Sequence, residues 1–195
     1  MDSEKKKILI VIVILLLLVF GIIAVRRGRP IPTEENSSQE AAPEESAPTA
    51  SENNIIRISS EKTDYQVDEV VPVNISFKAL GKKLFGSDIV LLFDPEFLST
   101  QVEDIQDGDF FASYPRKTVD PENGIVKLSA YQGQDIELAD QYYSIVNINF
   151  KALKKVETEI ALSWIKGATN TTNLVENGTS QNILEAVGNL KVTVE

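Results

Sequence analysis

Carboxylates are almost the only side chains in this sequence suited to chemistry, because its 195 residues contain 29 Asp and Glu but no His and no Cys. The absence of His and Cys excludes Ser-His and Cys-His nucleophile systems and the usual zinc sites. Glycoside hydrolysis needs only two carboxylates at a set separation. The acidic residues nevertheless fall mainly in turns and at outward strand positions. We therefore expect a protein that is not an enzyme and has no cofactor.

A cluster of three acidic residues offers oxygen ligands of the kind that calcium prefers. Asp104, Asp107 and Asp109 lie within the stretch DIQDGDFF. Their spacing does not match the calcium-loop pattern D-x-[DN]-x-[DN]-G, and Gly108 is typical of an ordinary turn. The sequence therefore favours a turn over a calcium site, and we predict no bound metal.

Three aromatic residues are candidates for stacking on a sugar ring. Tyr142 and Tyr143 stand at the start of a predicted strand, where one of them can face outward. Trp164 is in phase with the apolar residues Ile160 and Leu162, which favours a place in the core over a sugar platform. These three residues are the candidates for a carbohydrate-binding function.

Hydrophobic residues alternate with polar ones at a period of two, as in half-buried antiparallel strands. Residues 70–80 show the pattern most clearly, with these side chains on one face: Val71, Val73, Ile75, Phe77 and Ala79. The pattern recurs at residues 125–131, 144–153 and 189–194, with turn signals at 121–124 and 176–178. We predict an all-β jelly-roll β-sandwich of about eight to nine strands.

Two of these segments make specific predictions about which side chains face outward. In residues 125–131 the alternation turns Lys127, Ser129 and Tyr131 outward. In residues 144–153 it turns Val146, Ile148 and Phe150 inward and leaves the following side chains outside: Ile145, Asn147 and Asn149.

The N-terminal part has the features of a membrane anchor. Residues 8–25 carry no charge, and at about 1.5 Å per residue they give a helix of about 27 Å, close to the bilayer core. No Lys or Arg follows Arg29 until Arg57, which favours a transmembrane signal-anchor with residues 1–7 as a short cytoplasmic tail. A cleaved signal peptide is the alternative, but Ala24 makes a poor cleavage site because Val25 and arginines follow it. We expect a single-pass protein of the cell membrane with its C-terminal domain extracellular.

Residues 26–54 are expected to be a disordered tether, because residues 30–54 are rich in Pro, Glu, Ser and Ala. The remaining residues, 55–195, are numerous enough to bury a core. Their formal charge is −8: the chain carries −10, its first 29 residues have six basic and two acidic side chains, and the tether has six Glu. This acidity argues against a nucleic-acid partner.

The stretch GSDIVLLFDPEFL, residues 86–98, drives a buried strand into an Asp94-Pro95 corner and then places Phe97 and Leu98 beneath it. With YQVDEVVPVNI (65–75), VDPENGIVKLSAY (119–131) and YYSIVNINFKAL (142–153), this order resembles the cohesin family. Cohesins are the dockerin-binding modules of cellulosome scaffoldins and are similar in fold to certain cellulose-binding modules. The resemblance covers most of residues 56–194, with Phe93 in place of the usual Tyr.

The resemblance implies that one flat sheet face binds the paired helices of a dockerin. Asp88 matches a contact position of the family, while Gly86 stands where many cohesins have Asn, and Tyr131 lies near where an acidic contact often sits. The candidate partner-binding residues are Asp88, Lys127, Ser129 and Tyr131. Two simpler interpretations stay open: Asp88 merely solvates an exposed strand, and Tyr131 is an ordinary edge aromatic.

We therefore expect a membrane-anchored extracellular module that recognises a protein with a dockerin-like domain through an exposed sheet face. The alternatives are a polysaccharide-binding module and a structural spacer of an envelope complex. An exposed planar row of Tyr or Trp would favour carbohydrate. A flat polar face with Asp88 and Tyr131 at its centre would favour protein.

Overall fold

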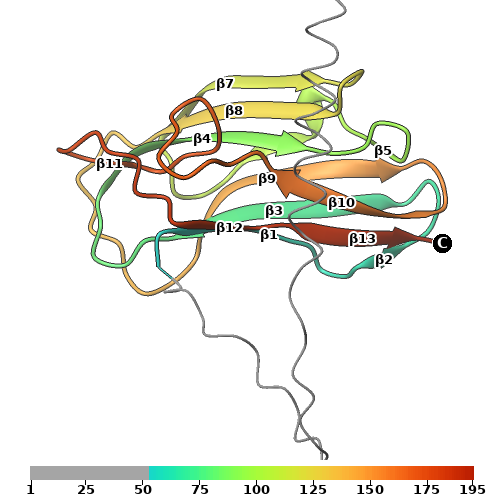
Figure 1. The fold of residues 1–195 in the computed structure, drawn as a ribbon, viewed down its shortest axis with the longest axis horizontal. Helices are drawn as coiled ribbons and strands as arrows, with labels where there is room; N and C mark the ends of the chain where they lie inside the picture. Colours follow the sequence, from blue (N-terminus) through green and yellow to red (C-terminus); the bar gives the residue numbers. More distant parts are fainter. Residues whose placement is uncertain (1–52) are drawn as a thin grey trace, which may run out of the picture. The chain divides into compact units, whose positions relative to one another are not determined.

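Apolar and polar residues alternate along the strands, and the alternation produces two β-sheets that pack through their apolar faces (Figure 1). The structure is a computed structural model that describes residues 53–195. The tail, the signal-anchor and nearly all of the tether, predicted for residues 1–54, lie outside these described residues. Within residues 53–195 no helix is long and apolar enough to cross a membrane.

The first sheet has six strands and is built around the pair β3 and β9. Its strands follow the order β12-β1-β3-β9-β5, and β6 also pairs with β9. Their bounds are Ala186–Gly188 (β12), Ile55–Ser59 (β1), Val70–Lys78 (β3), Tyr143–Ala152 (β9), Leu98–Ser99 (β5) and Ile105–Asp107 (β6). All pairs are antiparallel except β1 with β12.

The second sheet has seven strands and is built around β4. Its strands follow the order β2-β13-β10-β4-β8-β7, and β11 also pairs with β4. Their bounds are Asp64–Tyr65 (β2), Leu190–Val194 (β13), Val156–Leu162 (β10), Leu84–Leu92 (β4), Ile125–Tyr131 (β8), Ser113–Asp120 (β7) and Val175–Glu176 (β11). Figure 1 shows β4, β8 and β7 side by side. A short 3₁₀ helix covers Val102–Asp104.

The predicted all-β sandwich is confirmed for the described residues. Residues 53–195 form thirteen strands, more than the eight to nine expected, because five short strands of two or three residues add to eight strands of five or more. The inward face predicted for residues 70–80 is fully buried from Val71 to Ala79. The core therefore follows from the period-two pattern.

A β-bulge in β9 changes the predicted phase of one strand. Ile75 pairs with Val146, but Ser76 pairs with Ser144, so Ile145 is an extra residue on β9. Ile145 was expected to face outward, and this prediction is wrong because its side chain is fully buried. The bulge also reverses the phase beyond it, which places Tyr143 opposite the buried Phe77.

The Asp94-Pro95 corner ends β4 as expected from the sequence. The carboxylate of Asp94 accepts a hydrogen bond from the N–H of Glu96 at 2.9 Å. Its carbonyl oxygen accepts from the N–H groups of Phe97 at 3.2 Å and Leu98 at 3.0 Å. Leu98 is fully buried and Phe97 is half-buried, so apolar side chains do lie beneath the corner.

Gly124, in the turn between β7 and β8, fits closely against this corner. Its carbonyl oxygen accepts a hydrogen bond from the N–H of Phe93 at 2.9 Å. Its φ is +63°, and an added Cβ would lie 1.9 Å from the carbonyl oxygen of Phe93. Both the backbone conformation and the space therefore require glycine here.

The side chain of Tyr114 fastens β7 to the six-stranded sheet. Its hydroxyl donates a hydrogen bond to the carbonyl oxygen of Ile145 at 2.5 Å and accepts one from the N–H of Gly108 at 3.1 Å. Burial raises the pKa of Tyr114 to about 12, because the charged phenolate is poorly solvated there.

The close fit of Gly124 at the Asp94-Pro95 corner predicts that substitutions of two glycines differ in their effect on stability. Gly124→Ala should destabilise the protein by several kcal/mol, because a strained φ adds to a clash with backbone. Gly167→Ala is the matched control, since Gly167 has φ +78° but nothing within 4 Å of an added Cβ, and it should cost only about 1–2 kcal/mol. Urea unfolding measures both, and equal losses would contradict the tight fit at the corner.

The raised pKa of Tyr114 predicts that the protein loses stability at alkaline pH. Its pKa is higher in the folded protein than the ordinary value of 10.0, so its contribution is complete below about pH 10 and is lost as the pH rises through about 12. The free energy of unfolding should fall less steeply over this range in Tyr114→Phe than in the wild type. Identical slopes for the two proteins would contradict a raised pKa of Tyr114 in the folded protein.

Candidate functional site

The strands β4, β8 and β7 turn a set of mainly polar side chains to the outside of the seven-stranded sheet. Asp88 pairs with Ser129 on β8, and Ser129 pairs with Arg116 on β7. We call this surface the outer face and define it by Asp88, Val90, Arg116, Thr118, Lys127, Ser129 and Tyr131. It contains all four residues that the sequence proposed for partner binding.

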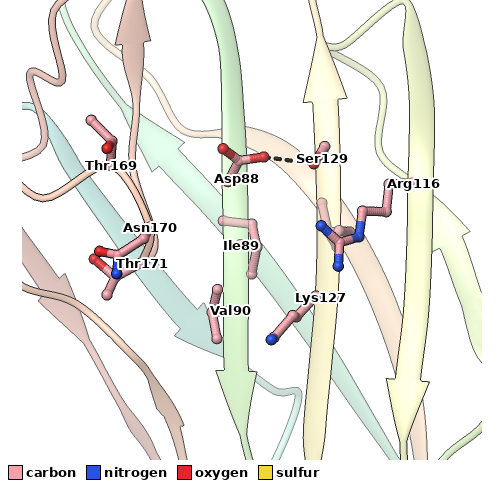
Figure 2. A pocket seen from close by; sticks show the side chains of 10 residues that line it. Asp88, Ile89, Val90, Arg116, Lys127, Ser129, Thr169, Asn170 and Thr171 are labelled. Carbon is pink, nitrogen blue, oxygen red and sulfur yellow. Dashed lines mark hydrogen bonds between the residues drawn. The ribbon is translucent and has the colours of Figure 1, made fainter.

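A shallow depression of about 280 Å³ lies over the middle of the outer face. Figure 2 shows Asp88 and Val90 of β4 at its centre, with Arg116 and Lys127 on one side. The loop residues Thr169, Asn170 and Thr171 line the other side. The depression is open and polar, a shape suited to surface contact rather than to enclosing a small molecule.

Asp88 lies at the centre of a hydrogen-bond network. One carboxylate oxygen accepts from the Ser129 hydroxyl at 2.6 Å, and the other accepts from the side-chain amide of Asn173 at 3.0 Å. The Asn173 side-chain oxygen in turn accepts from the backbone N–H of Asp88 at 3.0 Å. Asn173 is 2% exposed. The Asp88 carboxylate is therefore fixed in position by neutral donors.

The loop before β11 lies against β4 because β10 pairs with only the last two residues of β4. β10 pairs with β4 only at Leu91 and Leu92, which leaves the backbone of β4 without a strand partner around Val90. The Thr172 hydroxyl accepts from the N–H of Val90 at 3.1 Å, and the backbone N–H of Asn173 donates to the carbonyl oxygen of Asp88 at 2.9 Å. The loop thus completes the pairing of β4 and forms the wall of the depression.

Arg116 reaches the outer face through a bulge in β7. Ser113 pairs with Tyr131 and Arg116 pairs with Ser129, so β7 has one residue more than β8 between these pairs. Pro115 lies within this irregularity, in a strand at the edge of the sheet, where the missing N–H of proline is tolerated.

Tyr131 forms an exposed aromatic pair with Phe85 at one end of the outer face. The two rings pack edge to face with centroids 4.9 Å apart. Tyr131 is 39% exposed and Phe85 is 49% exposed. Large apolar side chains exposed together at the end of a polar face are typical of a contact surface for another protein.

The three carbohydrate candidates do not form an exposed row. Tyr143 faces inward after the β9 bulge, and its ring stacks on that of Phe77 with centroids 5.5 Å apart, so it does not contribute to an exposed row. Trp164 is partly buried and packs against the core, as the favoured interpretation expected. Tyr142 is half-buried, and the Arg57 guanidinium lies 3.4 Å from its ring centre.

The acidic cluster near Gly108 is used in other contacts. Asp107 forms an ion pair with Lys117, and the carboxylate of Asp104 accepts from the N–H of Gln101 at 3.1 Å. Within residues 53–195 no three acidic side chains gather in a way that would hold a metal ion.

Comparison with known proteins identifies the fold family. The family model described as Cohesin domain matches residues 56–189. This chain belongs to the cohesin-domain family. The resemblance inferred from the Asp94-Pro95 region is therefore confirmed. No curated protein matches the chain.

Solved structures of cohesins share the fold at low sequence identity. A ScaC cohesin of Acetivibrio cellulolyticus, in complex with the ScaB dockerin, is 19% identical with a TM-score of 0.56, covering 71% of this chain and 98% of that chain. A type II cohesin of the same organism is 17% identical with a TM-score of 0.54, covering 70% and 93%. The cohesin of an OlpA–Doc918 complex from Clostridium thermocellum is 16% identical with a TM-score of 0.56, covering 73% and 100%.

One departure of this cohesin domain from the family pattern has a steric reason. The resemblance to cohesins led us to expect Asn at position 86, but here a Cβ added to Gly86 would lie 2.6 Å from the carbonyl oxygen of Ala130. The backbones of β4 and β8 approach too closely for any side chain at this position. The neighbouring surface is instead occupied by Tyr131, which pairs with Gly86 across the strands.

Sequence reasoning missed three residues of the outer face and its support. Arg116 was missed because the alternation of residues within one strand does not reveal a β-bulge. Asn173 was missed because its strand partner is distant in the sequence. For Phe85 the sequence offered one indication, because the residue directly precedes Gly86, where the strands approach closely. Its exposure could not be predicted, because it depends on the position of Phe85 near the beginning of β4.

The network around Asp88 predicts a stability difference between two asparagines. Asn173→Ala should lower the free energy of unfolding by about 1–3 kcal/mol, because it leaves half-buried groups of Asp88 with fewer partners. Asn170→Ala, at an exposed position of the same loop, should change stability by less than about 0.5 kcal/mol. Urea unfolding compares the two, and equal effects would contradict the structural role of Asn173.

Proposed function

We propose that this cohesin domain is a non-catalytic module that binds a protein partner through its outer face. The observation that carries the proposal is the combination found there: a fixed polar centre at Asp88 and Ser129 beside the exposed aromatic pair of Tyr131 and Phe85. Exposed Tyr is enriched among the residues that dominate binding energy. A polar surface that is already rigid loses little conformational entropy on binding.

The proposed partner is a protein that carries a dockerin-like module. Two of the similar structures are complexes of a cohesin with a dockerin. Asp88 occupies the motif position that the family resemblance assigns to a partner contact. In this domain the carboxylate is held by Ser129 and Asn173, so it would meet a partner in one orientation.

Polysaccharide binding receives less support from the described residues. Tyr143 and Trp164 pack inward, and Arg57 covers the ring of Tyr142. These three side chains therefore offer no planar row on which a glucan chain would stack. A role as a structural spacer would not require the exposed aromatic pair of the outer face.

We further propose that the domain is displayed outside the cell from a membrane anchor. The uncharged run of residues 8–25 is long enough for a single span, and the Pro- and Glu-rich tether would hold the domain clear of the bilayer. The domain would then be free to meet a secreted partner.

A binding assay with paired variants tests the proposed function. Tyr131→Ala should weaken binding to a dockerin module of the same organism by about tenfold or more, the effect of losing an interface hot spot. Tyr142→Ala, which removes an aromatic ring beside the six-stranded sheet, is the control and should bind like the wild type.

The same proteins should be incubated with insoluble cellulose and chitin. Depletion by a polysaccharide that Tyr142→Ala abolishes and Tyr131→Ala does not would contradict the proposal and favour a carbohydrate module. Absence of binding in both assays would favour the spacer.

A further inference from the structure

Two cations of the outer face form no ion pair with a carboxylate within residues 53–195. Eight of the thirteen basic side chains there form ion pairs with carboxylates. Arg57 lies over the Tyr142 ring. The four basic residues without such a partner are Arg116, Lys127, Lys154 and Lys155. In a domain of net charge −8, two of these four lie on neighbouring strands of the proposed binding surface.

The neighbours of Arg116 and Lys127 on the sheet do not neutralise them. Across the strands Arg116 pairs with Ser129, and Lys127 pairs with Val90 and Thr118. Lys127 contributes to lowering the pKa of the exposed Asp120 carboxyl, but the hydrogen bonds from Asn123 contribute more. The two exposed cations therefore retain a local excess of positive charge.

Asp88 is the carboxylate at the centre of the face, and it forms no ion pair with Arg116 or Lys127. Its two oxygens accept hydrogen bonds from Ser129 and Asn173. Figure 2 shows Arg116 and Lys127 along the side of the depression opposite Thr169 and Asn170. A partner that covers this side must supply negative charge, because burying an unpaired cation costs several kcal/mol.

We propose that the partner presents carboxylates to Arg116 and Lys127 and an apolar side chain to Tyr131 and Phe85. This inference rests on the proposed function and specifies the partner's chemistry: an acidic, helical protein surface. Arginine favours such a contact because its guanidinium binds a carboxylate through two parallel hydrogen bonds. The outer face would thus select an acidic partner although the domain as a whole is acidic.

The sheet geometry sets the spacing of the partner's contact residues. Tyr131 and Lys127 are four residues apart on β8, which is about 13 Å at 3.3 Å per residue. A helix lying along β8 covers this distance in about nine residues at 1.5 Å each. Residues about seven or eleven apart share one face of a helix. The apolar contact and the carboxylates should therefore stand two to three turns apart on the partner helix.

An anionic polysaccharide would also satisfy the two cations, but the aromatic pair favours a protein. The rings of Phe85 and Tyr131 meet at 76°, so together they form no flat platform for a sugar ring. Their edge-to-face arrangement instead leaves an irregular apolar surface, which suits a branched side chain.

Charge reversal tests the inference on the full-length chain. The probes are purified dockerin modules encoded by the same organism, and the dissociation constant is measured by calorimetry. The double variant R116E/K127E should weaken binding at least tenfold, and replacing the facing acidic residues of the probe by Lys should restore it. The matched control K154E/K155E makes the same change in net charge in the turn between β9 and β10, and it should bind like the wild type. Unfolding midpoints check that all variants are folded.

Other outcomes are possible, and each contradicts either the acidic-partner inference or the proposed function. Undiminished binding by R116E/K127E, or equal loss in both double variants, would overturn the acidic-partner inference and leave the proposed function intact. Failure of every dockerin module to bind the wild-type chain would overturn the proposed function and this inference with it. Retardation of the wild type, but not of R116E/K127E, by polygalacturonate in a native gel would make the ligand an anionic polysaccharide and overturn the protein partner.

Discussion

The buried backbone N–H and C=O groups on both edges of β4 need hydrogen-bond partners, and the segments that supply these partners form the site. β8 satisfies one edge along most of its length, whereas β10 reaches only the last two residues of the other. The segment around Thr172 and Asn173 fills the gap. Because a buried unpaired backbone group is costly, this loop is held against β4, and it brings Asn173 to the carboxylate of Asp88.

The same arrangement separates the roles of the polar residues on the outer face. Asp88 and Ser129 are half-buried and bonded to each other, so they give the surface its shape and rigidity. Arg116, Lys127 and Tyr131 are exposed and remain available to a partner. In the proposed function, the residues that stabilise the surface and the residues that would contact a partner are therefore neighbours on the same strands.

The features readable from the sequence were those set by local chemistry. Period-two alternation located the buried face of β3, and the Asp94-Pro95 pair located the corner after β4. Features set by the pairing of distant strands were not readable. The extra residue Ile145 buries a side chain predicted outside, and Tyr143 packs against the core. The bulge at Pro115 likewise delivers Arg116 to the outer face, and no single-strand pattern contains it.

The proposed protein partner would cover the outer face of the seven-stranded sheet. Hydroxyl-radical footprinting of the full-length chain, with and without a bound dockerin module, can locate the partner because it reports on aromatic side chains exposed to solvent. If the partner covers the outer face, oxidation of Phe85 and Tyr131 should fall in the complex while that of Tyr142 is unchanged. Protection of Tyr142 with continued oxidation of Phe85 and Tyr131 would place the partner elsewhere and contradict binding through the outer face.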